Sequence, residues 1–120
     1  MTTSDEVRLD FDRRRRMGLD EAILAGSKSV AHLTTILDQA AQRDARFLFT
    51  RLSQEQFDAL PEAHRVRIDY DPLSRTGWFG MPDPLRSRTR VAVVAAGTSD
   101  VFVAREVVRT LGWYGEPALE

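Results

Sequence analysis

The sequence predicts an α/β protein, with a small N-terminal domain of β-β-α-β-α-β order over residues 6–70 and an incomplete Rossmann-like (flavodoxin-like) β-α unit over residues 91–120. Apolar and charged residues alternate in two stretches of the N-terminal part, as they do in half-buried strands. Serines at capping positions precede two stretches with helical spacing. From Val91 onward, a short apolar run leads through a small-residue loop into an amphipathic helix. Residues 71–90 hold three prolines and two glycines, a composition typical of a linker.

The N-terminal domain is expected to begin with two strands and a helix. Residues 7–11 alternate between apolar and charged side chains, which predicts the first strand, and residues 19–25 form a short apolar run suited to the second. Ser29 is expected to cap a helix that ends near Arg43. One face of that helix would carry the apolar residues Val30, Leu33, Leu37 and Ala40.

The rest of the N-terminal domain is expected to be a buried strand, a short helix and a half-buried strand. Residues 47–49 form a compact apolar run suited to a central strand. Ser53 and Gln56 have the spacing of a capping box, so a helix should start there and stop before Pro61. Residues 66–70 alternate again between apolar and charged side chains, which predicts the last strand.

Two aromatic residues and two histidines have roles that the pattern leaves open or makes ordinary. Trp78 and Phe79 are apolar residues in a polar linker. They either pack against the next domain or a neighbouring subunit, or cover the edge of the small domain. His32 and His64 are expected at surface or boundary positions.

Composition excludes several classes of function. The 120 residues carry 17 basic and 18 acidic side chains, so the formal net charge of −1 gives no general attraction to nucleic acid or to an anionic membrane. The absence of cysteine excludes disulfides, thiolate ligands and a cysteine nucleophile in this chain, and two histidines are too few for a histidine metal cluster. Neither a signal peptide nor a membrane span is recognisable, so a cytoplasmic protein is expected.

The best functional candidate is the loop Gly97-Thr98-Ser99-Asp100, between a predicted strand and a predicted helix. Free backbone N–H groups and the positive end of the helix dipole favour an anion at such a place. Asp100 could accept a hydrogen bond from a sugar hydroxyl. The alternative is an ordinary βα turn in which Ser99 or Asp100 only caps the helix.

Arginine makes up all of the basic residues except Lys28, which reflects either a genomic GC bias or a preference for binding phosphate and carboxylate groups. The run of four arginines at residues 13–16 could contact phosphates. It is closely flanked by acidic residues, so a solvated turn with local ion pairs is the alternative.

Several motifs, in order along the chain, resemble the LarB family, the carboxylase–hydrolases of nickel-pincer nucleotide biosynthesis. The C-terminal domain of that family is related to the aminoimidazole ribonucleotide (AIR) carboxylases of purine synthesis, the PurE family. The matching stretches are Asp10 to Glu21, Lys28-Ser29, Thr50-Arg51-Leu52-Ser53, Asp71-Pro72-Leu73-Ser74-Arg75 and Val91 to Asp100.

The chain also departs from the family pattern at three places. Leu19-Asp20-Glu21-Ala22 stands where the family has F-P-E-V, and Gly26-Ser27 shifts the glycine before the lysine by one position. Ala96 and Gly97 occupy the first two positions of the G-S-x-S-D pattern of AIR carboxylases, which favours the pincer-nucleotide branch.

The resemblance implies an enzyme that carboxylates the pyridinium ring of nicotinic acid adenine dinucleotide with CO2 or bicarbonate and releases AMP. The family's activating cysteine would lie beyond residue 120, so no catalytic residue is assigned here and the chain alone is expected to be inactive. Residues 97–100 would hold the nucleotide phosphate and ribose. The secondary candidates for a dinucleotide phosphate are Arg13, Arg16, Lys28, Arg51 and Arg75.

The same resemblance implies no cofactor and no metal in this chain, while leaving room for Mg²⁺ in the complete enzyme, which would be a homo-oligomer. Neither nucleic acid nor membrane is an expected partner. Two other interpretations stay open: a relative of the AIR carboxylases or mutases, and a non-catalytic binding or regulatory module that retains the N-terminal domain. The reading frame beyond Glu120 would discriminate between enzyme and module.

Overall fold

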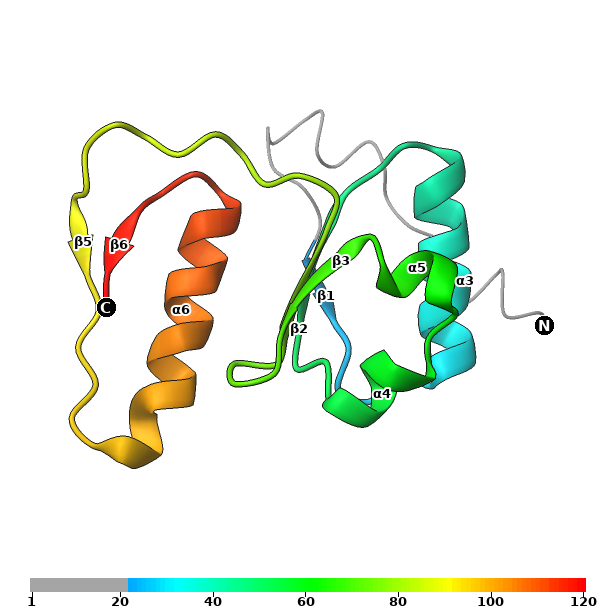
Figure 1. The fold of residues 1–120 in the computed structure, drawn as a ribbon, viewed down its shortest axis with the longest axis horizontal. Helices are drawn as coiled ribbons and strands as arrows, with labels where there is room; N and C mark the ends of the chain where they lie inside the picture. The colour runs from blue at the N-terminus through cyan, green and yellow to red at the C-terminus, as the bar shows by residue number, and fades with distance from the viewer. Residues whose placement is uncertain (1–21) are drawn as a thin grey trace.

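The computed structural model describes residues 22–120, so the predicted strand at 7–11, Arg13 and Arg16 lie outside the described residues. A four-stranded sheet stands between two layers of helices, and a pair of short strands lies beyond the last helix (Figure 1). The elements are β1 (Ala22–Leu24), α3 (Val30–Gln42), β2 (Phe47–Thr50), α4 (Gln54–Ala59), α5 (Glu62–Arg65), β3 (Ile68–Asp71), β4 (Thr76–Phe79), β5 (Val91–Ala92), the 3₁₀ turn η1 (Thr98–Asp100), α6 (Val101–Trp113) and β6 (Ala118–Leu119).

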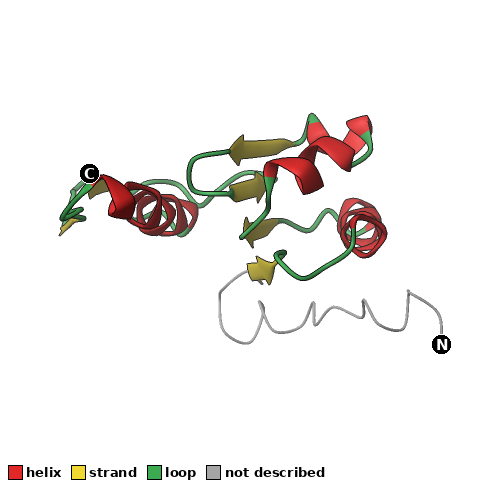
Figure 2. Ribbon diagram, turned by 90° about the horizontal axis from the view of Figure 1, so that it is seen from below, coloured by secondary structure: helices red, strands yellow, loops and turns green. Residues whose placement is uncertain are grey.

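The strand order of the main sheet is β1-β2-β4-β3. β1 and β2 are parallel, and β4 is antiparallel to both β2 and β3. Helices α3, α4 and α5 cover one face of this sheet and α6 lies on the opposite face, as the view from below shows (Figure 2). The predicted mixed α/β class is therefore confirmed, whereas the described order β-α-β-α-α-β-β differs from the predicted order of elements.

The main core lies between the sheet and α3, where local signals predicted the elements well. The Ser29 side chain accepts a hydrogen bond from the His32 backbone N–H at 3.0 Å, and the C-cap is Arg43, as expected. β2 is central and buried, also as expected. Side chains on this face pack against α3 because alternate residues of each strand point the same way. The core includes Ile23, Leu33, Ile36, Leu37, Ala40, Phe47, Phe49, Ile68 and Phe79.

The segment between β2 and β3 confirms one prediction and corrects two. Ser53 and Gln56 form the predicted capping box, and α4 ends before Pro61. The helix α5 was not predicted. Because α5 occupies residues up to Arg65, the strand predicted from residue 66 begins only at Ile68. His64, expected near the surface, is buried by α5, and its Nε2 lies 2.6 Å from Asp38 Oδ1.

The stretch predicted to be a linker, residues 71–90, contains a strand at the centre of the sheet. β4 lies between β2 and β3, so the prediction is wrong for Thr76–Phe79. A Cβ atom at Gly77 would lie 3.0 Å from the Ile68 side chain and 3.3 Å from that of Leu52. A side chain here would therefore press on both neighbours, so the packing favours glycine, although glycine locally favours a turn. The proposed domain boundaries stay a prediction.

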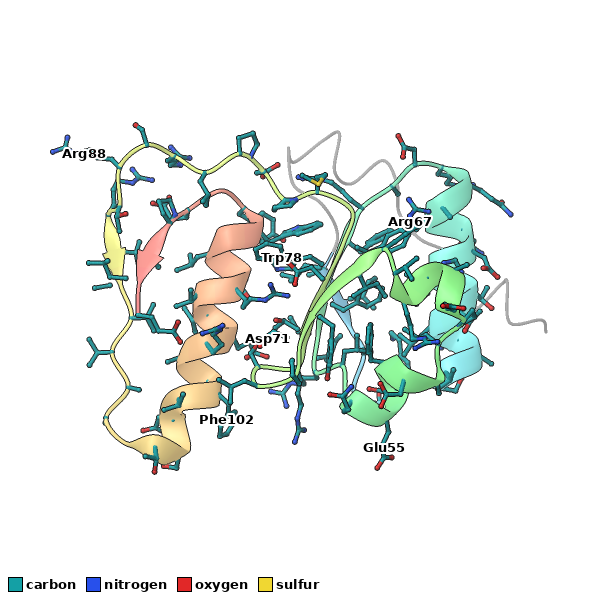
Figure 3. The ribbon with its side chains drawn as sticks, viewed as in Figure 1. Glu55, Arg67, Asp71, Trp78, Arg88 and Phe102 are labelled. Atoms are coloured by element: carbon teal, nitrogen blue, oxygen red, sulfur yellow. The ribbon has the colours of Figure 1, made fainter. Side chains whose placement is uncertain are left out.

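Trp78 and Phe79 lie in β4, an inner strand of the sheet, so neither covers an edge of the small domain, as one of the two interpretations had it. Phe79 is fully buried in the core on the α3 face. Trp78 points the other way, and its ring centroid lies 6.0 Å from that of Trp113 in α6 (Figure 3). Successive side chains of a strand point to opposite faces, so neighbouring aromatics serve two different interfaces.

Helix α6 docks on the sheet through an unexpected face. The amphipathic helix predicted from the sequence carries Ala104, Val107, Val108 and Leu111 on one face, of which Ala104 is buried and Val107 is exposed. The contacts with the sheet come instead from Arg105, Arg109 and Trp113, which are spaced four residues apart and form one stripe. β5 and β6 are paired in parallel on the far side of α6 (Figure 1). No helix of residues 22–120 is long and apolar enough to cross a membrane.

Replacing Leu33 by Ala should lower the free energy of unfolding by about 2–5 kcal/mol, because the substitution leaves a cavity in the core. Leu33 is fully buried on α3. Leu85→Ala is the matched control, since Leu85 is exposed in the segment between β4 and β5. This substitution should lower the free energy of unfolding by less than about 0.5 kcal/mol. Urea denaturation followed by circular dichroism measures both, and equal midpoints would contradict the assignment of the core.

Candidate functional site

The loop Gly97-Thr98-Ser99-Asp100 is open to solvent at the start of α6. Apart from its chain neighbours, no atom lies within 4 Å of a Cβ placed at Gly97. The Asp100 N–H donates to the Gly97 carbonyl at 3.0 Å, and the Val101 N–H donates to the Thr98 carbonyl. The Asp100 side chain makes no capping hydrogen bond to α6. The interpretation of Asp100 as a helix cap is therefore not what the structure shows, and its carboxylate remains exposed.

Three of the secondary candidates come together at one edge of the main sheet. Lys28 follows the carboxyl end of β1 and Arg51 follows that of β2, and these strands are parallel. Arg75 precedes β4, which is antiparallel to β2, so it lies at the same edge. The Leu52 N–H donates to the Arg75 carbonyl at 2.8 Å, and a Cβ at Gly26 would lie 3.4 Å from the Arg51 Cβ. We call this set of Lys28, Arg51 and Arg75 the basic edge.

A polar side chain ties the two loops of the basic edge to each other. Gln56 Nε2 donates to the carbonyl oxygens of Ala25 at 2.8 Å and Lys28 at 3.0 Å. Its Oε1 accepts from the Ser53 N–H at 2.9 Å in the capping box. The loop after β1 and the loop after β2 are therefore held side by side. Ligands of open α/β sheets bind outside the carboxyl ends of parallel strands, which is where these loops lie.

A cavity of about 420 Å³ opens between the basic edge and the first turns of α6. Phe102 stands at this end of α6, facing the β3–β4 turn (Figure 3). None of the residues 97–100 lines the cavity, although Phe102 follows that loop closely in sequence. Its lining residues are Arg51, Ser74, Arg75, Phe102, Val103 and Glu106.

Arg51 and Arg75 have an unusual backbone conformation. Their φ angles are +54° and +58°, in the left-handed region that residues other than glycine, Asn and Asp seldom occupy. Such a conformation costs on the order of 1 kcal/mol for each residue. Within residues 22–120, neither guanidinium group has a hydrogen-bond or ion-pair partner. Arginine binds carboxylate and phosphate groups through parallel N–H donors, so two arginines without a partner among the described residues suit an anion.

The arginines of α6, in contrast, are used to dock the helix. Arg109 Nε donates to Thr76 Oγ1 at 2.9 Å, and its Nη2 donates to the Asp69 carbonyl at 2.6 Å. The guanidinium carbon lies 4.2 Å from the centroid of the Trp78 ring. Arg105 Nε lies 3.5 Å from Asp71 Oδ2. These contacts hold one wall of the cavity against the sheet.

Asp71 and Ser74 connect this docking surface to the floor of the cavity. Ser74 Oγ donates to Asp71 Oδ2 at 2.6 Å and lies 2.9 Å from Thr76 Oγ1. Burial alone would raise the pKa of Asp71, but the hydrogen bonds from Ser74 and the charges of Arg105 and Arg109 outweigh burial and lower the pKa below its ordinary value. Asp71 therefore stays ionised beside the cavity.

No group of three or more His, Asp or Glu side chains that could hold a metal ion occurs in the part of the chain that the structure describes. Sequence reasoning selected Arg51 and Arg75 but missed Ser74, Phe102 and Glu106. The motif around Asp71 contained Ser74 and could have indicated it. Phe102 and Glu106 become part of a site only because α6 docks through its arginine stripe, and no local signal predicts that choice.

The fold and the site define a mixed α/β protein with a basic edge that suits a phosphate or another anion. A family model described as the LarB/PurE-like N-terminal domain matches residues 1–80, and the match ends directly after β4. The chain therefore belongs to the LarB family, as the motifs suggested, and through it to the LarB- and PurE-related carboxylases. A comparison with curated proteins gives no significant match.

Replacing Asp71 by Asn should remove part of the acid sensitivity of the fold. A carboxyl group whose pKa is lower in the folded than in the unfolded state stabilises the fold above its unfolded pKa, and this stabilisation is lost as the pH falls through the folded pKa. The ordinary value is 3.8, so the loss should occur below about pH 4. Melting temperatures between about pH 6 and pH 2 measure it.

The matched control is Asp44→Asn, which changes an exposed carboxylate outside the docking surface. Asp71→Asn should lower the melting temperature near neutral pH and flatten its fall in acid, whereas Asp44→Asn should leave the shape of the curve unchanged. Parallel curves for the native chain and Asp71→Asn would show that Asp71 does not anchor the β3–β4 turn.

Proposed function

We propose that the chain is the N-terminal domain and the first β-α unit of the carboxylase-like domain of a LarB-type enzyme. That enzyme would carboxylate the pyridinium ring of nicotinic acid adenine dinucleotide with CO2 or bicarbonate, cleave the phosphoanhydride and release AMP during nickel-pincer cofactor synthesis. The observation that carries the proposal is the family match over residues 1–80, followed in sequence by the V-x-V-V-x-A-G-T-S-D stretch at residues 91–100.

The role proposed for residues 97–100 is to bind the phosphate and ribose of the dinucleotide. The loop precedes a helix of 13 residues, whose first N–H groups and dipole favour an anion. Asp100 supports this role because its carboxylate is exposed and is not used as a cap. A ribose hydroxyl could therefore donate to it without breaking an existing contact. Arg13, Arg16, Lys28, Arg51 and Arg75 are secondary candidates for the dinucleotide phosphates.

The chemistry of carboxylation requires more than this chain contains. A thiolate would add to the pyridinium ring and turn a ring carbon into a nucleophile toward CO2, and the chain has no cysteine. We infer that the nucleophile belongs to a following α/β domain and that the complete enzyme is a cytoplasmic homo-oligomer. The alternatives remain a relative of the AIR carboxylases or mutases, and a non-catalytic binding or regulatory module that retains the N-terminal domain.

The complete enzyme, encoded by a reading frame that continues into a cysteine-bearing domain, should release AMP from nicotinic acid adenine dinucleotide when bicarbonate is present. Liquid chromatography of the products measures AMP and the carboxylated mononucleotide. The 120-residue chain is the matched control and should release none, since it lacks the nucleophile. AMP release by this chain alone would contradict the requirement for a cysteine, and no release by the complete enzyme would contradict the proposed function.

In the complete enzyme, Asp100→Ala should raise the dissociation constant for the dinucleotide roughly tenfold or more, since a hydrogen bond to a charged group contributes roughly 1.5–3 kcal/mol. The melting temperature should change little, because Asp100 makes no capping bond. Calorimetric titration beside a melting curve separates affinity from stability. An unchanged dissociation constant would rule out Asp100 as a ligand.

A further inference from the structure

The cavity between the basic edge and α6 has the features of a binding site in its own right. Its volume of about 420 Å³ falls within the roughly 300–1,000 Å³ typical of small-molecule pockets. Two of the residues that line it are arginines that flank the neighbouring strands β2 and β4 at the same edge of the sheet. None of residues 97–100 lines this cavity, so it is distinct from that loop. Arg51 and Arg75 are the arginines already proposed for a dinucleotide phosphate, and the inference rests on the proposed function in that respect.

The charge of the cavity favours an anion. Arg51 and Arg75 line the same small space, and within residues 22–120 neither has a counter-ion. Two like charges held close together repel each other, and a shared anion removes this cost. Arginine binds phosphate through two parallel N–H donors, so two arginines can enclose the oxygens of one phosphate group.

The backbone of the two arginines supports the same conclusion. Both residues keep a left-handed conformation, and the Leu52 N–H bonded to the Arg75 carbonyl at 2.8 Å ties one strained loop to the other. Glycine would adopt this conformation without strain. Packing does not require arginine at either position, since both side chains are exposed. Both guanidinium groups are therefore available to a ligand.

The opposite wall of the cavity is apolar and aromatic. Phe102 is 52% exposed, although it is a large hydrophobic residue, and Val103 lies beside it. A planar ring stacked on Phe102 would remove this surface from water. Glu106, the one carboxylate among the lining residues, would repel a phosphate at its own end but can accept a hydrogen bond from a hydroxyl group.

We propose that this cavity binds a phosphomonoester that carries an aromatic ring, such as a nucleoside monophosphate. Arg51 and Arg75 hold the phosphate, the ring packs on Phe102 and Val103, and Glu106 accepts from a hydroxyl of the sugar. The inference concerns binding by this chain and does not require carboxylase activity of a longer enzyme.

The test is calorimetric titration of the 120-residue chain with AMP, adenosine and inorganic phosphate at low and at physiological salt. AMP should bind, and its affinity should fall with rising salt, since the contact is ionic. Adenosine should bind at least about tenfold more weakly, because it lacks the phosphate. Inorganic phosphate binding as tightly as AMP would overturn the aromatic part of the proposal, and no AMP binding at millimolar concentration would overturn all of it.

Arg51→Gly and Arg75→Gly separate binding from folding. Each removes a guanidinium and fits the left-handed backbone, so the melting temperature should stay level or rise while the affinity for AMP falls about tenfold or more. Arg88→Ala is the matched control, because Arg88 is an exposed arginine of the connector, far from the cavity (Figure 3). AMP binding that survives both glycine variants, or that falls equally with Arg88→Ala, would overturn the site.

Phe102→Ala tests the other wall of the cavity. The variant should weaken AMP binding several-fold while leaving the weak binding of inorganic phosphate unchanged, because the phosphate contacts only the arginines. Equal losses for the two ligands would overturn the assigned orientation. Since these measurements use the chain without turnover, they can fail while the complete enzyme still carboxylates its substrate, and they can succeed where it does not.

Discussion

Arg109 crosses from α6 to the sheet and ends among polar atoms of β3 and β4, where its side chain is 12% exposed. A guanidinium withdrawn from water must find partners for its donors, and here Thr76 and Asp69 supply them while the Trp78 ring covers one face of the group. Few orientations of α6 satisfy all of these contacts at once. The helix is thereby fixed on the sheet, and Phe102, about two turns earlier, is placed opposite the β3–β4 turn. Arg109 is therefore a main contact that keeps the two walls of the cavity facing each other.

The same constraint explains why the arginine stripe, and not the apolar stripe, faces the sheet. The second face of β3 offers Asp69 and Asp71, since alternate side chains of that strand point away from α3. Arg109 and Arg105 match these carboxylates, so charge complementarity decides the orientation. Trp113 and Trp78 then add apolar contact at the other end. The remaining face of α6, including Val107, points away from the sheet.

The sequence predicted correctly those helices that are stabilised by contacts between residues close together in the chain. Ser29 and Ser53 cap their helices by contacts within one turn, so spacing alone was sufficient. β4 was missed because the close approach of Ile68 and Leu52 that favours glycine at position 77 comes from residues distant in sequence, while the neighbours of Gly77 suggest a turn. The same distinction applies to the site. Arg51 and Arg75 could be predicted from the sequence motifs in which they stand, whereas Phe102 lines the cavity with them only because α6 docks on the sheet.

The distribution of compensated and uncompensated charge explains why a chain of net charge −1 has a basic site. Around the β3–β4 turn, the carboxylate of Asp71 accepts a hydrogen bond from the Ser74 hydroxyl and pairs with the positive charge of Arg105 at 3.5 Å. The negative charge of Asp71 is therefore balanced by the docking contacts and contributes little to the electrostatic potential in the cavity. Arg51 follows β2 and Arg75 precedes β4 at the same edge of the sheet. Neither guanidinium is paired with a carboxylate of the described residues. α3 also begins at this edge, after Ser29, and the positive end of its dipole adds to the field there. The docking that neutralises the acidic residues is thus what leaves the basic edge electrostatically available to an anion.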